Sequence, residues 1–462
     1  MITRRLKLAI PLLMIASVVL FFEFNGSFNA ILPGKGFTFT TPETPSLHTT
    51  IRSGLNSDSW IPLIISECID GLNKDAAPCI QQRNPDSNLI KAQELIYKPF
   101  RLRVPRFISK KHKDQWLEAV KDLDRLRISN DMEWADYPTA NAQNLVFANA
   151  VYDGSPPPDE WSNVGCMNIA VSHDSFLQSP IPETKAFDHE TLVIATSPDS
   201  WSWQHFLDRV TIVWSQSLFA INDHDRSNSS MISGRAPNSP FVDEMYTMMG
   251  VKSHVHYETG NRQPQSAKNL VFSCRAPLVH PYTTQRVSEM MGVDLHKVPL
   301  SKRKVILYMS RSHGDIANSG RQIVNEEEFL ERLEALIKKR GLGEKLELFD
   351  RRKYSSVQDI IQYLTQNVMA IIGPHGSAFH NGRFASSDTL IYEFMPDGRF
   401  QSCFWEQSHL LEQNYFSYMA KSLNDDNDMQ IVEMDAVIQI LDENLGKVPK
   451  PTLVESYPWK II

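Results

Sequence analysis

The feature that most constrains the fold is a continuous apolar run, Val368–Ile372, which breaks at the turn Gly373-Pro374-His375-Gly376. Such a run is typical of a strand buried on both faces of a parallel sheet. The turn would place a histidine and backbone N–H groups at the carboxyl end of that strand, beside the expected start of a helix. Ligands bind at that edge of an open α/β sheet, and helix N-termini favour phosphate groups. A tight turn with a surface histidine would have the same local sequence, so the surrounding segments decide between the two.

The segments around this run alternate between strands and helices. Strands are predicted at 304–310, 346–349 and 389–394. Two helices are predicted between them, with Asn325 and Ser356 as their N-caps. Strands and helices that alternate at this spacing imply right-handed crossovers and a parallel sheet, so the fold class is α/β.

This topology places several polar groups along one edge of the sheet. Arginine offers a planar fork of donors that matches phosphate oxygens, so Arg311, Arg321 and His375 suit a diphosphate. An acid such as Glu393 could accept hydrogen bonds from ribose hydroxyls. The sequence has neither a P-loop motif nor a Gly-x-Gly-x-x-Gly motif, which weighs against kinase-type and dehydrogenase-type sites. The candidate nucleotide-sugar-binding residues are Arg311, Arg321, Gly373, His375, Gly376, Ser377 and Glu393.

The amino-terminal region has a second candidate segment. Strands are predicted at 144–148, 167–171 and 191–196, and the last one leads into a helix that opens at Gln204–Arg209. A histidine in the first turns of a helix that follows a strand would face a cleft between two Rossmann-like units. His205 is therefore a candidate general base, and Asp208 could orient it or act in its place. The alternative is a structural histidine packed among the neighbouring aromatic side chains.

Five segments together resemble glycosyltransferase family 61, whose members include β-1,2-xylosyltransferases and the EGF-domain O-GlcNAc transferase. The resemblance covers roughly residues 190–400 and rests on Arg311 and on the segments 201–209, 320–328, 372–378 and 391–396. It implies a GT-B architecture, in which two Rossmann-like lobes face a nucleotide-sugar cleft and the donor binds the carboxyl-terminal lobe. It also implies inversion at the anomeric carbon without a required metal or other cofactor.

The chain departs from the family pattern in two places. After the histidine the family commonly reads Gly-Ala-Gly-Leu-Thr-Asn, whereas this chain reads Gly376-Ser377-Ala378-Phe379-His380-Asn381. The spacing from His205 to Asp208 is also shorter than in animal members. These departures leave the donor sugar and the acceptor open.

The N-terminus predicts a secretory address. Arg4, Arg5 and Lys7 precede an apolar run from Leu8 to Phe22. A span of about 15 residues suits the thin membranes of the early secretory pathway, and the basic flank would keep the N-terminus cytosolic. We therefore expect a type II protein of the Golgi or ER membrane with a lumenal catalytic region. A cleaved signal peptide is the alternative.

Length and charge bound the remaining possibilities. A chain of 462 residues with 42% hydrophobic content can bury more than one core, so two domains are expected. The net charge of −7 argues against nucleic-acid binding. The expected organisation is an anchor at 1–24, a stem at 25–58, an acceptor-side lobe at 59–285 and a nucleotide-sugar-binding lobe at 286–462.

Cysteines and sequons fit a lumenal location. Five cysteines suit an oxidising compartment with one thiol left over, and Cys68 with Cys79 is the favoured disulfide. Asn228 begins a plausible N-glycosylation sequon, whereas the sequon at Asn25 lies too close to the expected membrane span.

A metal site is the less favoured reading. Asp223-His224-Asp225 has the letters of a metal-binding Asp-x-Asp, but it lies in a polar loop after a helix. His254 and His256 would point the same way on a strand, but no third zinc ligand stands at a suitable spacing. The run Asp425–Asp428 is expected to be a solvated loop.

The sequence thus predicts an inverting glycosyltransferase that uses a UDP-sugar, with xylose or GlcNAc as the favoured sugar and a glycan or glycoprotein as acceptor. Two alternatives stay open. One is another nucleotide-sugar or nucleotide-phosphate enzyme on the same sheet. The other is a carbohydrate-binding protein that kept the fold and lost turnover.

Overall fold

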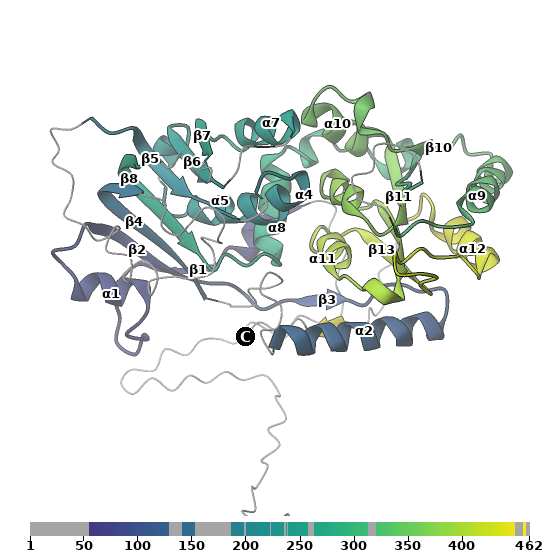
Figure 1. The fold of residues 1–462 in the computed structure, drawn as a ribbon, viewed down its shortest axis with the longest axis horizontal. Coiled ribbons are helices and arrows are strands. Elements are labelled where there is room, and N and C mark those ends of the chain that lie inside the picture. Colours follow the sequence, from purple (N-terminus) through teal and green to yellow (C-terminus); the bar gives the residue numbers. More distant parts are fainter. Residues whose placement is uncertain are drawn as a thin grey trace, which may run out of the picture. The chain divides into compact units, whose positions relative to one another are not determined.

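A five-stranded parallel sheet carries the Gly-Pro-His-Gly turn (Figure 1). In the computed structural model its strand order is β10-β9-β11-β12-β13. Because the chain passes from β9 to β10 on one side and then returns to β11 on the other, the strand order reverses between β9 and β11. The strands are β9 (Val305–Tyr308), β10 (Lys345–Leu348), β11 (Val368–Pro374), β12 (Leu390–Pro396) and β13 (Asn414–Ala420).

The parallel arrangement confirms the α/β class that the alternating segments predicted. Every residue of β11 and β12 is buried, as expected for strands covered on both faces. The elements around this sheet are η4 (Leu300–Lys302), α9 (Glu326–Arg340), η5 (Arg351–Lys353), α10 (Val357–Asn367), η6 (Ser377–Phe384), η7 (Asp397–Arg399), α11 (Cys403–Leu410) and α12 (Met434–Asn444).

The two predicted N-caps behave differently. The Ser356 hydroxyl accepts a hydrogen bond from Asp359 N at 3.0 Å, so it caps α10 as expected. Asn325 occupies the N-cap position of α9 but forms no capping hydrogen bond. Its side-chain amide instead pairs with the backbone of Ile431, both accepting from the N–H and donating to the carbonyl at 3.0 Å. This position therefore ties α9 to the segment before α12.

A seven-stranded mixed sheet forms from the region before residue 275, in the order β1-β2-β4-β8-β5-β6-β7. The pairs from β1 to β8 are antiparallel, and the pairs from β8 through β5 and β6 to β7 are parallel. The strand order of the parallel part reverses between β5 and β8. The strands are β1 (Leu63–Ile65), β2 (Leu89–Ile96), β4 (Asn141–Tyr152), β5 (His189–Ile194), β6 (Ser229–Ser233), β7 (Ser253–His256) and β8 (Gln265–Cys274).

The helices of this region are mostly short. They are η1 (Ser57–Trp60), α1 (Ala77–Arg83), α4 (Trp203–His205), η2 (Phe206–Val210), α5 (Thr211–Ser217), α6 (Asp223–Arg226), α7 (Pro240–Met248), α8 (Pro281–Met290) and η3 (Asp294–His296). The predicted helix after residue 203 is interrupted, because η2 is one turn of π-helix.

The structure describes residues 55–128, 141–152, 186–197, 200–221, 223–234, 237, 239–256, 263–312, 320–448 and 456–458. The expected membrane anchor and the expected strand at 167–171 lie outside these ranges. Within them, no helix has both the length and the apolar character needed to span a membrane. Contacts divide the chain into Met1–His48 and Thr49–Ile462, and all described residues belong to the second unit.

One segment of the amino-terminal region packs on the five-stranded sheet. Arg106 N donates to Tyr415 O at 3.3 Å, and Met419 N donates to His112 Nδ1 at 3.1 Å. One hydrophobic core also joins the sheets, since Val193 of β5 and Ile371 of β11 belong to the same cluster of buried side chains. The elements here are β3 (Arg101–Arg103) and α2 (Lys110–Ile128), and β3 pairs with β14 (Ser456–Pro458).

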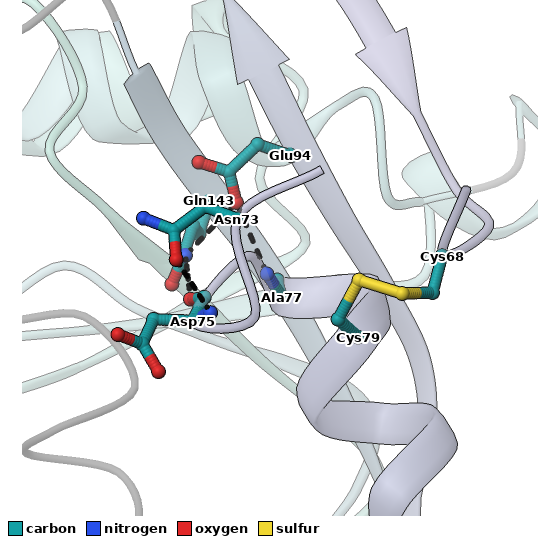
Figure 2. The surroundings of a disulfide bond; sticks show 7 residues. All are labelled: Cys68, Asn73, Asp75, Ala77, Cys79, Glu94 and Gln143. Atoms are coloured by element: carbon teal, nitrogen blue, oxygen red, sulfur yellow. Dashed lines mark hydrogen bonds between the residues drawn. A yellow bond between two sulfur atoms is a disulfide. The ribbon is translucent and has the colours of Figure 1, made fainter. Parts of the chain in front are cut away.

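A disulfide joins Cys68 to Cys79, the pair that the sequence favoured (Figure 2). It fastens the start of α1 to the chain that follows β1. Beside it, the buried Glu94 carboxylate accepts hydrogen bonds from Ala77 N at 3.1 Å and from Gln143 Nε2 at 2.9 Å. Cys274 is also disulfide-bonded, and Cys403 is a free thiol.

We expect the free energy of unfolding of the Cys68→Ser, Cys79→Ser double variant to be about 2–3 kcal/mol lower than that of the wild type, because the bridge constrains the unfolded chain. Denaturant unfolding followed by circular dichroism measures this difference. Cys403→Ser is the control, because that cysteine forms no bridge. An equal loss in the control would mean that the bridge itself adds nothing.

Candidate functional site

The strand reversal of the five-stranded sheet brings the predicted phosphate-binding groups together. Arg311 follows the end of β9 and His375 follows the end of β11, and these neighbouring parallel strands end at the same edge. Ligands of open α/β sheets bind outside the carboxyl ends of the strands where the strand order reverses. The topology therefore supports the ligand-binding reading of the turn over a plain surface turn.

His375 is held by a buried carboxylate. Its Nδ1 donates to Glu393 Oε1 at 2.5 Å, and Tyr415 donates its hydroxyl hydrogen to Glu393 Oε2 at 2.5 Å. Glu393 is fully buried, so its oxygens accept hydrogen bonds from these two neighbours and are not accessible to a ribose. The geometry thus favours an orienting role over the ribose-binding role expected from sequence. A carboxylate at Nδ1 holds a hydrogen on that nitrogen and so sets the tautomer and the orientation of the ring.

Three arginines come together beside this histidine. Burial, the Arg311 charge and the Arg399 charge lower the pKa of Arg321 to about 10. Burial and Arg399 also lower the pKa of Arg311, and Asp428 opposes them. Among the described residues, no carboxylate forms an ion pair with Arg321 or Arg399. Arg311 and Arg321 are buried and Arg399 is exposed. Three cations gathered this closely are suited to an anion that they share.

Backbone contacts set the position of these arginines. Arg311 Nε donates to Gly320 O at 2.7 Å, and Arg321 itself has a left-handed backbone with a φ of 60°. A Cβ on Gly376 would lie 2.6 Å from the Arg311 guanidinium, so only glycine leaves the guanidinium in this place. A Cβ on Gly373 would likewise lie too close to the Met309 carbonyl oxygen. Ser377 is exposed.

The second candidate pair lies at the strand reversal of the other sheet. The chain leaves β5 and reaches α4, where the Ser202 hydroxyl accepts from His205 N at 3.4 Å. His205 Nδ1 is 3.5 Å from Asp208 Oδ1, an ion-pair distance rather than a short hydrogen bond. Asp208 lies in the π-helical turn, and such turns occur often at functional sites.

Asp208 is held in its ionised form. Burial alone would raise its pKa, but the contact with His205 and the charges of His205, His380 and Arg209 outweigh burial and lower it. The coupling to His380 is informative because His380 belongs to η6, the segment that follows the Gly-Pro-His-Gly turn. The structure thus brings the predicted base segment close to the predicted phosphate segment.

His380 and Arg383 are buried polar groups that the sequence reading did not assign. Burial lowers the pKa of His380 to about 3 and that of Arg383 to about 10. Among the residues that the structure describes, neither His380 ring nitrogen has a hydrogen-bond partner, and neither has Arg383 Nε or one of its terminal nitrogens. Unpaired buried groups are rare away from functional sites and ordered water. The sequence did single out His380, because this histidine occupies a position where the family pattern has threonine.

The structure bears on four further sequence predictions in different ways. Asn228 is exposed, as a glycosylation site must be. His254 is not a plain surface residue, because its Nε2 is 3.0 Å from Asp243 Oδ1 and its ring stacks on Tyr246. In the part of the chain that the structure covers, no cluster of three or more His, Cys, Asp or Glu side chains could hold a metal. The polar residues of the loop 313–319 lie outside the described ranges.

We expect Gly376→Ala to abolish the thermal stabilisation that inorganic pyrophosphate gives the wild type. The new Cβ displaces the end of a flexible arginine side chain, so the unliganded protein should keep nearly its normal melting temperature. Differential scanning fluorimetry measures both quantities. Ser377→Ala, a change at the exposed neighbour, is the control, and pyrophosphate should stabilise it as much as the wild type. If pyrophosphate also stabilised Gly376→Ala to that extent, the Arg311 guanidinium would not bind the anion.

The buried His380 should make the protein sensitive to acid. Its pKa of about 3 lies below the ordinary value of 6.5, so between these values the unfolded chain takes up a proton that the folded chain does not. The free energy of unfolding should therefore fall below pH 6.5, by up to about 1.4 kcal/mol per pH unit from this group. Urea unfolding of wild type and His380→Thr from pH 7.5 to 4.5 measures this slope, which should be shallower in the variant. Equal slopes would contradict the buried neutral histidine.

Comparison with known proteins gives one strong and one weak result. Residues 203–392 match the family model described as Glycosyltransferase 61. Among curated proteins there is no match. Matches among solved structures include histidine-to-aspartate and histidine-to-alanine mutants of a flavo di-iron protein from Thermotoga maritima. Each is 11% identical with a TM-score of 0.22, and the match covers 52% of this chain and about half (52%) of the other. A likeness that weak carries no argument.

The family match contains both candidate segments, from α4 through His205 and Asp208 to Arg311, Arg321, the Gly-Pro-His-Gly turn and the start of β12, whereas Glu393 and Arg399 lie beyond it. It supports glycosyltransferase activity in general, with a donor and an acceptor as substrates. Residues 203–392 of this chain therefore match glycosyltransferase family 61.

Proposed function

We propose that the protein is an inverting glycosyltransferase that moves xylose or GlcNAc from a UDP-sugar to a glycan or glycoprotein. The observation that carries this proposal is the arginine cluster, Arg311, Arg321 and Arg399, beside the carboxylate-held His375. These groups would bind the diphosphate and stabilise the charge that develops as it leaves. The choice of sugar rests on the family resemblance alone.

The proposed reaction uses groups from both sheets. The acceptor hydroxyl oxygen attacks the anomeric carbon while the bond from that carbon to the diphosphate oxygen breaks on the opposite face. UDP leaves with the bonding electrons, and a general base takes the hydroxyl proton. A GT-B arrangement, with two lobes facing one nucleotide-sugar cleft, is part of this proposal. The electrostatic interaction of His380 with Asp208 supports it, because these two residues belong to the two candidate segments.

We assign the base to His205 rather than to Asp208. A carboxylate with a lowered pKa is a poor proton acceptor near neutral pH. The same carboxylate, 3.5 Å from His205 Nδ1, would stabilise the imidazolium that forms when His205 takes the proton. The charge that other glycosyltransferases obtain from a metal ion would come from the arginines, so we propose no required cofactor.

We also propose that the catalytic region lies in the lumen of the Golgi or ER, attached by one N-terminal helix. The basic flank and apolar run before residue 23 support this, as do the disulfide-bonded Cys68, Cys79 and Cys274. Disulfides form and persist in oxidising compartments.

Two variants separate donor binding from chemistry. Arg321→Ala should abolish the stabilisation by UDP, because it removes a charge that contacts the diphosphate. His205→Ala should keep that stabilisation but reduce UDP release from a UDP-sugar with acceptor by about 10²–10⁴-fold, as expected for loss of a general base. Thermal shift with UDP, GDP and ADP and an assay of released UDP measure both effects.

The matched control is Arg332→Ala, which removes an exposed arginine of α9 far along the chain from the turn. It should behave like the wild type in both assays. Full activity of His205→Ala would show that another group is the base. UDP stabilisation without transfer to any acceptor would favour the carbohydrate-binding alternative.

A further inference from the structure

The acidic run Asp425–Asp428 is not the plain solvated loop that its composition predicts. Asp428 Oδ1 accepts a hydrogen bond from the backbone N–H of Gln322 at 2.8 Å. The backbone carbonyl of Asp426 accepts from Arg321 N at 2.9 Å, and Met429 N donates to Gln322 O at 2.8 Å. A Cβ on Gly320 would lie 2.4 Å from the Asp426 carbonyl, so the two segments touch. The loop therefore fixes the backbone on both sides of Arg321.

The other end of the same loop holds the turn that carries Arg399. Ser422 N donates to Asp397 Oδ1 at 2.8 Å, and the Ser422 hydroxyl accepts from Gly398 N at 2.9 Å. The Asn427 side chain also closes on Gly398, where a Cβ would lie 2.4 Å from its Oδ1. One loop, Ser422–Asp428, thus contacts the segment that carries Arg321 and the turn that carries Arg399.

Asp428 is itself held from within the loop. Its backbone N–H donates to Asn424 Oδ1 and its Oδ2 accepts from Asn424 Nδ2, both at 2.9 Å. Leu423 N donates to Asp428 O at 2.8 Å. These bonds leave Asp428 Oδ1 in one place, directed at Gln322 N.

We propose that the loop Ser422–Asp428 is the positioning element of the anion site, with Asp428 as its central residue. The proposal rests on the proposed function. Arg311, Arg321 and Arg399 repel one another, so in the absence of ligand their segments tend to separate. The loop opposes this separation, because it holds the backbone of Arg321 in its left-handed conformation and ties it to the Arg399 turn. The protein can then offer a ready-made site to a diphosphate.

The direction in which removal of Asp428 changes anion affinity distinguishes a positioning role from a purely electrostatic one. Asp428 is a negative charge close enough to Arg311 to affect its pKa. If Asp428 acted only as a charge, its removal would strengthen the binding of an anion. If it positions Arg321, its removal must weaken that binding, because the loss of geometry outweighs the loss of repulsion.

Isothermal titration of the full-length protein with UDP measures the effect, at a temperature well below the melting point of each variant. Asp428→Ala should weaken UDP binding by about tenfold or more. Asn424→Ala leaves the charge unchanged and removes only the bonds that hold Asp428, so it should weaken binding in the same direction by a few-fold. Asp425→Ala is the control, since Asp425 is exposed in the same loop and its side chain forms no hydrogen bond with the described residues.

Unchanged or tighter UDP binding by Asp428→Ala would overturn the positioning role. If Asp428→Ala does not fold, Asn424→Ala decides alone, and wild-type affinity in that variant would overturn it. A failure of the proposed function looks different, because the wild type would then not bind UDP at all.

Discussion

Repulsion among Arg311, Arg321 and Arg399 is the interaction on which the site depends. Burial lowers the pKa of Arg321, and the charges of Arg311 and Arg399 lower it further. Like charges held this close together raise the free energy of the empty protein. The surrounding structure must therefore hold them by other means. It does so with a backbone carbonyl for Arg311, a glycine that leaves it room, and hydrogen bonds to the backbone around Arg321. An anion that bridges the cations removes the repulsion, so binding energy is available at the position where a leaving diphosphate would gain charge.

The two strand reversals explain how distant segments contribute to one site. Arg311 and His375 follow β9 and β11, and the segment with His205 follows β5. The η6 segment connects the two groups, because His380 is coupled both to His375 and to the His205–Asp208 pair. This arrangement suits a reaction in which one end of the substrate is an anion and the other loses a proton.

Sequence patterns predicted four strands of the five-stranded sheet, because buried parallel strands such as Val368–Ile372 have a strong apolar signal and their helices have clear boundaries. They missed β13. They also indicated Arg311, Arg321 and His375, since position at a strand end depends only on topology. The orienting role of Glu393 could not be predicted, because it depends on Tyr415 in the next strand. The N-capping role predicted for Asn325 was wrong for a similar reason, because its side chain hydrogen-bonds the backbone of Ile431 instead. Arg399 has no local pattern, and its place in the cluster follows from contacts with a loop near residue 425.

The most direct measurement of the central claim compares the affinities of UDP, UMP and uridine by calorimetry at two salt concentrations. If the arginine cluster recognises the diphosphate, affinity should rise steeply with each phosphate, uridine should bind at least about 100-fold more weakly than UDP, and salt should weaken UDP binding. Uridine binding as tight as UDP binding, with no dependence on salt, would mean that the arginine cluster contributes nothing to recognition.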